Sequence, residues 1–107
     1  MDTYFENLNK KLKNYQRAIP CLLVDLDVLD KNINTLQSNL RPNADLRIVV
    51  KSLPSLDLIG YILQKTNTHK LMVFHQPFLT DLSSKLDDKK DVLLGKPMPI
   101  KTAEYFY

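Results

Sequence analysis

A lysine at the end of a strand-like stretch is the residue of this sequence with the clearest potential for chemistry. The stretch LRIVVKS, residues 46–52, is a short apolar run that ends at Lys51. An extended backbone places Lys51 on one face with Val49 and Arg47, at the carboxyl end of a buried strand. In parallel α/β proteins ligands bind at that end, because the loops that follow the strands converge there. Lys51 is therefore either a functional amine or a solvated lysine that closes the strand.

Two more polar residues, His75 and Lys96, end the next two predicted strands and could face the same mouth as Lys51. His75 could stack on a ligand ring or hydrogen-bond to it. It could equally bond only to the neighbouring backbone, as polar residues at strand ends commonly do. Lys96 is typical of a solvated loop lysine, and His69, in the turn TNTHK, is expected on the surface.

The carboxylates Asp25 and Asp27 have the spacing of an acid/base pair, but structural roles account for them more simply. We expect Asp25 to end a strand and Asp27 to be the N-cap of the following helix. There its carboxylate would accept hydrogen bonds from free amides and meet the positive end of the helix dipole.

Composition excludes several classes of protein. The 107 residues are 44% hydrophobic and 25% charged, with a net charge of +3 and lysines interleaved with aspartates, so nucleic-acid binding is not indicated. Cys21 is the only cysteine, which rules out an intrachain disulfide and a cysteine metal cluster. We expect a cytoplasmic protein without a membrane segment, because the longest apolar stretch, IPCLLVDLDVL, is short and interrupted by aspartates.

The first part of the chain predicts a helix, a strand and a second helix. Thr3 and Glu6 have the spacing of a capping box, and apolar residues then recur at helical spacing to about Arg17. We treat residues 1–18 as an N-terminal amphipathic helix. A short strand is expected from Cys21 to Leu26, followed by a helix whose apolar face is Leu29, Ile33, Leu36 and Leu40.

The rest of the chain predicts three strand–helix repeats. Strands are expected near Leu46, at 70–75 and at 91–96, and Ser55, Pro77 and Pro97 precede the intervening and final helices. Nearly continuous apolar strands joined by helices of this length favour a parallel sheet with right-handed crossovers.

An open doubly wound sheet and a closed (β/α)₈ barrel both accept such repeats. Only Gly60 and Gly95 are present, so there is no glycine-rich phosphate loop of the kind that nucleotide-binding open sheets use. A barrel needs about 250 residues. We therefore expect residues 19–107 to be the N-terminal part of a (β/α)₈ barrel, with three βα repeats preceded by a helix and a short strand.

Two phrases together resemble a known family. IPCLLVDLDVLDKNI, followed by LRIVVKS, resembles the N-terminal domain of the alanine racemase superfamily, and more closely its branch with D-threonine aldolase and D-serine dehydratase. The resemblance implies a TIM-type barrel and pyridoxal 5'-phosphate (PLP) bound as a Schiff base to Lys51. From its place at the end of the second strand, His75 is a candidate second contact to that cofactor. Partial desolvation at a barrel mouth would favour the neutral amine, the form that attacks the aldehyde.

The sequence also departs from these relatives. No tyrosine follows Lys51 as in alanine racemases, and the histidines that surround the lysine in the aldolase and dehydratase branch are missing. A lysine followed three residues later by a proline, as in Lys51 and Pro54, is similar to the pattern in the pyridoxal-phosphate homeostasis proteins, a related barrel without known turnover.

We therefore expect a PLP-dependent isomerase or lyase that acts on an amino acid, of the D-amino acid racemase, aldolase or dehydratase type. Activity is expected of the complete protein rather than of these residues alone, with an amino acid as small-molecule partner and a homodimer as one assembly. No metal site is expected from these residues. The alternatives are a non-catalytic PLP carrier and a small α/β interaction module.

Overall fold

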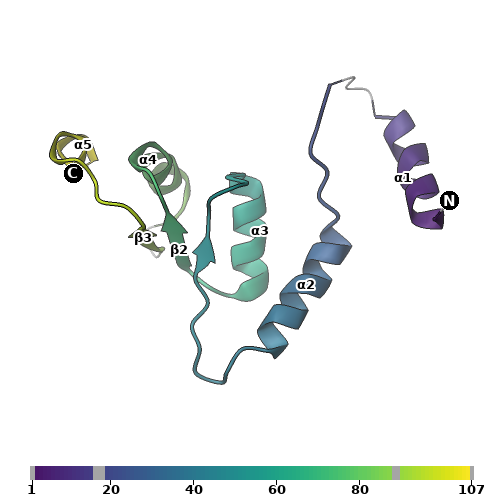
Figure 1. The fold of residues 1–107 in the computed structure, drawn as a ribbon, viewed down its shortest axis with the longest axis horizontal. Coiled ribbons are helices and arrows are strands. Elements are labelled where there is room, and N and C mark those ends of the chain that lie inside the picture. Colours follow the sequence, from purple (N-terminus) through teal and green to yellow (C-terminus); the bar gives the residue numbers. More distant parts are fainter. Residues whose placement is uncertain (1, 16–18, 88–89, 107) are drawn as a thin grey trace.

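The computed structural model describes residues 2–15, 19–87 and 90–106 (Figure 1). Within these ranges the chain forms five helices and a sheet of three parallel strands, so the expected α/β class is confirmed. The elements in chain order are α1 (Thr3–Lys13), α2 (Leu26–Ser38), β1 (Ile48–Val49), α3 (Leu56–Thr66), β2 (Lys70–Val73), α4 (Gln76–Lys85), β3 (Asp91–Leu94) and α5 (Ile100–Phe106).

Helix α1 forms where amphipathic periodicity predicted it, but its ends differ from the prediction. Asp2, not Thr3, is the N-cap, because the carboxylate of Asp2 accepts from the backbone amide of Tyr4 at 3.2 Å. The helix ends at Lys13 rather than near Arg17, and residues 16–18 lie outside the described ranges. None of the α1 residues is buried, so its apolar face is open to solvent.

The strand expected from Cys21 to Leu26 is wrong. Residues 19–25 form no strand in the structure, and Leu26 is already the first residue of α2. The physical reason is that an apolar run becomes a strand only when a neighbour takes its backbone hydrogen bonds, and residues 19–24 have none among the described residues. The expected N-cap is also wrong: Asp25 caps α2, because its carboxylate accepts from the amides of Asp27 and Val28 at 3.0 and 3.1 Å.

The repeats after residue 46 are confirmed, with strands shorter than expected. The strand order is β1-β2-β3, and Ile48 lies opposite Leu71 while Lys70 lies opposite Asp91. Ser55 caps α3 as predicted, accepting from the amide of Leu58. The crossover helix α3 follows β1 after residues 50–55, and α4 follows β2 after residues 74–75.

The two faces of the sheet differ. One face, here called the covered face, packs against both α3 and α4. The buried cluster on it consists of Val50, Leu71 and Val73 from the sheet region, Ile59 and Leu63 from α3, and Leu79 and Leu82 from α4. Strand alternation places Val49, Met72 and Leu93 in neighbouring positions on the other face, here called the open face. Val49 is 55% exposed and Leu93 49% exposed, so both flanks of the open face are accessible to solvent, with the partly buried Met72 between them.

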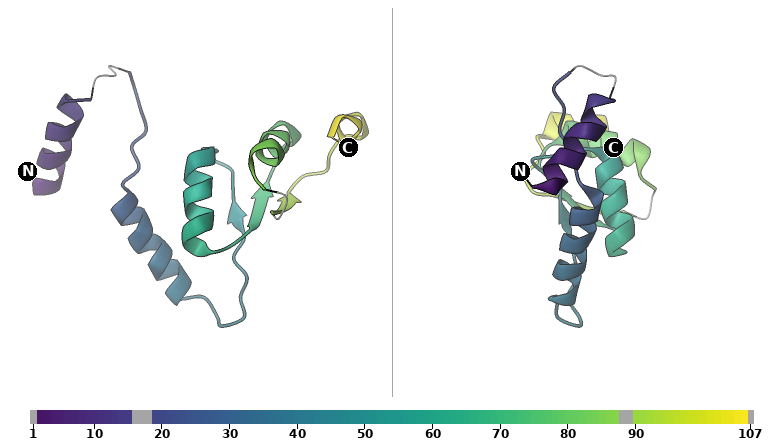
Figure 2. Two further views of the ribbon diagram at one scale, coloured as in Figure 1. Left: turned by 180° about the vertical axis from the view of Figure 1, so that it is seen from behind. Right: turned by 90° about the vertical axis from the view of Figure 1, so that its right-hand side faces the viewer.

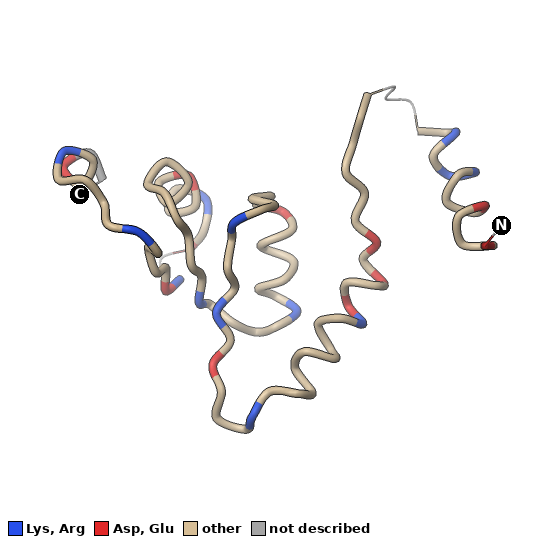
Figure 3. The backbone as a smooth tube through the Cα atoms, viewed as in Figure 1, with Lys and Arg blue, Asp and Glu red and all other residues tan. Residues whose placement is uncertain are grey.

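The molecule is elongated. Figures 1 and 2 show α1 and the segment after it extending away from the three-stranded sheet. The radius of gyration is 17.6 Å, against about 13 Å for a compact domain of this length. Figure 3 shows acidic and basic residues interleaved along the chain rather than gathered on one element. None of the helices in the described ranges combines the length and apolar character that a membrane crossing requires.

Candidate functional site

Lys51 lies where strand alternation predicted it, just beyond β1 at the carboxyl end of the sheet. Its side chain is exposed, and its Nζ lies 5.5 Å from the centroid of the Phe74 ring, within range of a cation–π contact. The partial burial expected for this amine is not found in the structure. Lys51 is thus an accessible primary amine beside an aromatic ring.

Phe74 was not singled out from the sequence, although a signal for it exists. It follows β2 directly and has the same strand parity as Met72, whose partner across the sheet is Val49. One step further along both strands, the same pairing brings Phe74 beside Lys51. The register between β1 and β2 is therefore what places the ring under the amine.

Gly95 completes this row of the open face. A Cβ atom at Gly95 would lie 2.6 Å from Met72 Cε and 2.8 Å from Phe74 Cε1, so the ring of Phe74 occupies the space that a side chain would take. Lys96, the next residue, is exposed as expected. At this end of the sheet the three strands thus present an amine, a ring and a glycine in order.

His75 has a local structural role. Its Nδ1 accepts from the backbone amide of Phe78 at 3.3 Å, which makes His75 the N-cap of α4, and the two rings meet edge to face. In the neutral ring this acceptor role leaves the proton on Nε2. The structure thus shows one of the two alternatives for His75, a hydrogen bond to the neighbouring backbone. The other alternative, contact of His75 with a cofactor, stays a prediction.

The opposite end of the sheet is held by an ion-pair network. Arg47 Nη1 and Nη2 donate to the two carboxylate oxygens of Asp91 at 3.0 and 2.8 Å, and Nη1 also donates to the Leu71 carbonyl at 2.8 Å. These hydrogen bonds lower the pKa of the Asp91 carboxyl and raise that of Arg47. Lys70 pairs with Asp45 beside them and lowers the pKa of that carboxyl. Because the side chain of Arg47, the residue before β1, reaches across β2 to β3, we assign this network to strand alignment.

Asp25 and Asp27 do not form an acid/base pair. Besides capping α2, Asp25 accepts from the hydroxyl of Tyr4 at 2.7 Å. This hydrogen bond, together with that from the Val28 amide, lowers the pKa of Asp25, and it raises the pKa of Tyr4. Asp27 lies exposed in the first turn of α2.

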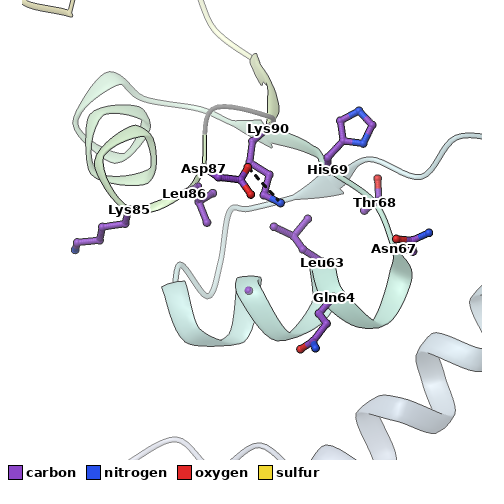
Figure 4. A pocket seen from close by; sticks show the side chains of 10 residues that line it. Leu63, Gln64, Asn67, Thr68, His69, Lys85, Leu86, Asp87 and Lys90 are labelled. Atoms are coloured by element: carbon purple, nitrogen blue, oxygen red, sulfur yellow. Dashed lines mark ion pairs between the residues drawn. The ribbon is translucent and has the colours of Figure 1, made fainter.

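A surface hollow of about 760 Å³ lies at the far end of the sheet from Lys51 (Figure 4). It lies between the end of α3 and the loop after α4, and His69 at its rim is exposed, as predicted. Its lysines have carboxylate partners: Lys90 lies 3.8 Å from Asp87, and Lys85 pairs with an acid one turn earlier on α4. The hollow therefore offers no unpaired charge to a ligand among these lysines and lies away from the carboxyl ends of the strands.

Within the described ranges, no group of three histidine, cysteine, aspartate or glutamate residues is placed to hold a metal ion. Comparison of the chain with protein-family models, with curated proteins and with solved structures finds no match.

Proposed function

We propose that this chain carries the cofactor-binding lysine of a PLP-dependent enzyme that acts on an amino acid, and that its sheet is part of the wall of a (β/α)₈ barrel. The observation that carries the proposal is the exposed amine of Lys51 at the carboxyl end of β1, 5.5 Å from the ring of Phe74. Sequential parallel strands with both crossover helices on one face support the barrel, since a doubly wound sheet places helices on both faces.

The residues at this end of the sheet fit PLP in three respects. The amine of Lys51 is open to an aldehyde, and Phe74 offers a flat apolar surface to an aromatic ring. Helices α3 and α4 both begin here, and the amides at helix N-termini attract phosphate groups. When bound, PLP withdraws electrons from the α-carbon of an amino acid.

The contribution of the chain to such a reaction is binding, orientation and proton transfer. Lys51 would hold PLP through its amine, and the same amine would serve as the base for the proton on the substrate α-carbon. Phe74 limits the positions of the lysine side chain through the ring contact.

The first test is chemical trapping on Lys51. The chain is incubated with PLP and reduced with borohydride, and the modified lysine is located by peptide mass spectrometry. We expect one adduct per chain on Lys51, lost in Lys51→Ala. Lys96→Ala is the matched control, because Lys96 is also exposed and also follows a strand, and this variant should keep the adduct. Equal labelling of Lys96, or of many lysines, would show that Lys51 is an ordinary surface amine.

A second test separates an enzyme from the non-catalytic carrier. The D- and L-forms of serine, threonine and alanine are supplied with PLP and the protein in deuterated water, and exchange of the α-hydrogen is followed by NMR. We expect exchange of at least one D-amino acid well above the rate with free PLP. The preference for D-amino acids rests on the resemblance of LVDLD and Lys51 to the aldolase and dehydratase branch. A trapped adduct without exchange of either enantiomer would favour the carrier.

A further inference from the structure

The free edge of β1 is a vacant position for one more strand. Among the described strands, whose order is β1-β2-β3, β1 has a hydrogen-bonded neighbour on one side only. The Val50 amide donates to the Met72 carbonyl at 2.9 Å, so Val50 points toward β2. Successive residues of a strand point their backbone groups to opposite edges, so the amide and carbonyl of Val49 point to the free edge.

Helix α2 already occupies the place of a crossover helix for that missing strand. It packs on α3, where Asp30 accepts from the Tyr61 hydroxyl at 2.7 Å and pairs with Lys65 at 2.5 Å. At the carboxyl ends of both helices, Gln37 donates to the Thr66 carbonyl. Because crossovers between parallel strands are right-handed, a strand that precedes α2 belongs beside β1 and parallel to it. The residues that precede α2 are 19–25, here called the arm segment.

The arm segment has the character of a strand without a partner. Its side chains are apolar up to Asp25, and no backbone hydrogen bond joins residues 19–24 to the rest of the described chain. Leu22 is 83% exposed, and the neighbouring apolar residues of the segment are exposed as well. On α2, Leu36 is also exposed, which leaves part of the helix face open. An extended apolar segment with free backbone groups is well suited to adding to the edge of a sheet.

The arm segment of the same chain does not fill the vacancy. Figures 1 and 2 show it running on from the start of α2 and away from the sheet, toward α1. The hinge between the arm segment and α2 is at Asp25. Its carboxylate fixes the hinge, because it caps α2 and also accepts from the Tyr4 hydroxyl of α1. Closure of the segment onto β1 of its own chain requires a different backbone conformation at the hinge.

We infer that the arm segment of a second copy pairs with the free edge of β1, and that the exchange is reciprocal. Two chains then form a closed dimer with the same contact made twice, and each hinge keeps its observed conformation. The exchange supplies partners for the Val49 backbone groups and covers apolar side chains of the arm segment. This interface is separate from Lys51, so it holds or fails independently of the proposed PLP chemistry.

The experiment measures assembly and pairing together. Sedimentation equilibrium of the 107-residue chain gives the oligomeric state, and hydrogen exchange by NMR gives the protection of individual amides. We expect a dimer in which amides of residues 21–24 and the Val49 amide are protected roughly 100-fold relative to open chain. Val49 is the diagnostic residue, since pairing of two arm segments with each other would leave its amide unprotected.

Two matched double variants distinguish backbone pairing from apolar adhesion. Leu22→Pro with Leu23→Pro removes two amides from an exposed stretch, so it should abolish the dimer and the protection of Val49 without unfolding the chain. Leu22→Thr with Leu23→Thr removes the same apolar side chains but keeps the amides and the strand propensity, so it should still dimerise.

Four outcomes would overturn the inference. The first is a monomer in which the Val49 amide is protected, which means that the arm segment closes within its own chain. The second and third are a monomer and a dimer in which the Val49 amide is unprotected. The fourth is a proline variant that still dimerises. Trapping of PLP on Lys51 is measured on the same samples, so that failure of the dimer and failure of the proposed function are read separately.

Discussion

Removing a leucine from each face of the sheet measures how much stability each face provides. Leu71 in β2 is fully buried against the helices, whereas Leu93 in β3 lies on the open face and is 49% exposed. Leu71→Ala removes three carbons worth about 0.8 kcal/mol each, or about 2.4 kcal/mol, and the cavity left behind raises the cost to about 3–4 kcal/mol. Leu93→Ala loses roughly half of that transfer free energy, about 1.2 kcal/mol, and solvent fills the space.

Urea denaturation followed by circular dichroism checks these magnitudes. With a slope of about 1.5 kcal/mol per molar urea, Leu71→Ala should lower the midpoint by about 2 M and Leu93→Ala by less than 1 M. Protein concentration is held constant, because association shifts apparent stability. If the two variants are equally destabilised, the open face is covered in solution and the assignment of a single helix-covered core is refuted.

Three further predictions concern the ion-pair network, a helix end and the lysine site. Hydrogen bonds from Arg47 lower the pKa of the Asp91 carboxyl in the folded protein. The stability that this carboxyl contributes is therefore present above its unfolded pKa, near 3.9, and is lost as the pH falls through the lower folded pKa. The free energy of unfolding should decline below about pH 4. Asp91→Asn should make that decline shallower in thermal unfolding from pH 7 to pH 2, and an unchanged profile would count against the network. Asn67 ends α3 with a φ of 52°, so Asn67→Val should cost about 1–2 kcal/mol in urea unfolding while Asn67→Gly is nearly neutral; equal losses would contradict the left-handed geometry. Gly95→Ala places a Cβ 2.8 Å from the ring of Phe74, so the ring should move. The ring-current shift of the Lys51 side-chain protons should then change in NMR spectra. Unchanged shifts would refute the packing of Phe74 against Gly95.

Helix positions could be predicted from the sequence because they depend on local patterns. The spacing of Leu29 and Ile33 predicted the apolar face of α2, on which Ile33 is buried, and Ser55 was expected just before α3, which it caps. The same local reasoning chose Thr3 and Asp27 as caps where the structure has the acids at positions 2 and 25. In both cases an acceptor lay within two residues of the helix start, and sequence alone does not say which one the backbone turns toward.

Strand pairing could not be predicted to the same degree because it depends on a distant neighbour. The pattern of residues 21–26 predicted a strand, yet these residues run away from the sheet, and no described strand pairs with the free edge of β1. For the same reason Lys51 was found from its place in the sequence, while its contact with Phe74 required the register between two strands. A candidate residue can therefore be read from one segment, but the site around it is set by tertiary structure.

The order of the strands in the sheet has a consequence for how the chain acquires its structure during synthesis. Each strand pairs with the next one along the chain, about 20 residues later, so every pairing closes a short loop. A ribosome adding roughly 5–20 residues per second needs one to a few seconds for each such repeat, whereas helix formation and loop closure take microseconds or less. Each strand–helix unit therefore has time to dock on the one before it, and the sheet grows from β1 toward β3 in the order of translation. Throughout that growth the newest strand presents an unpaired edge to the cell, and it is the next repeat to emerge that removes it.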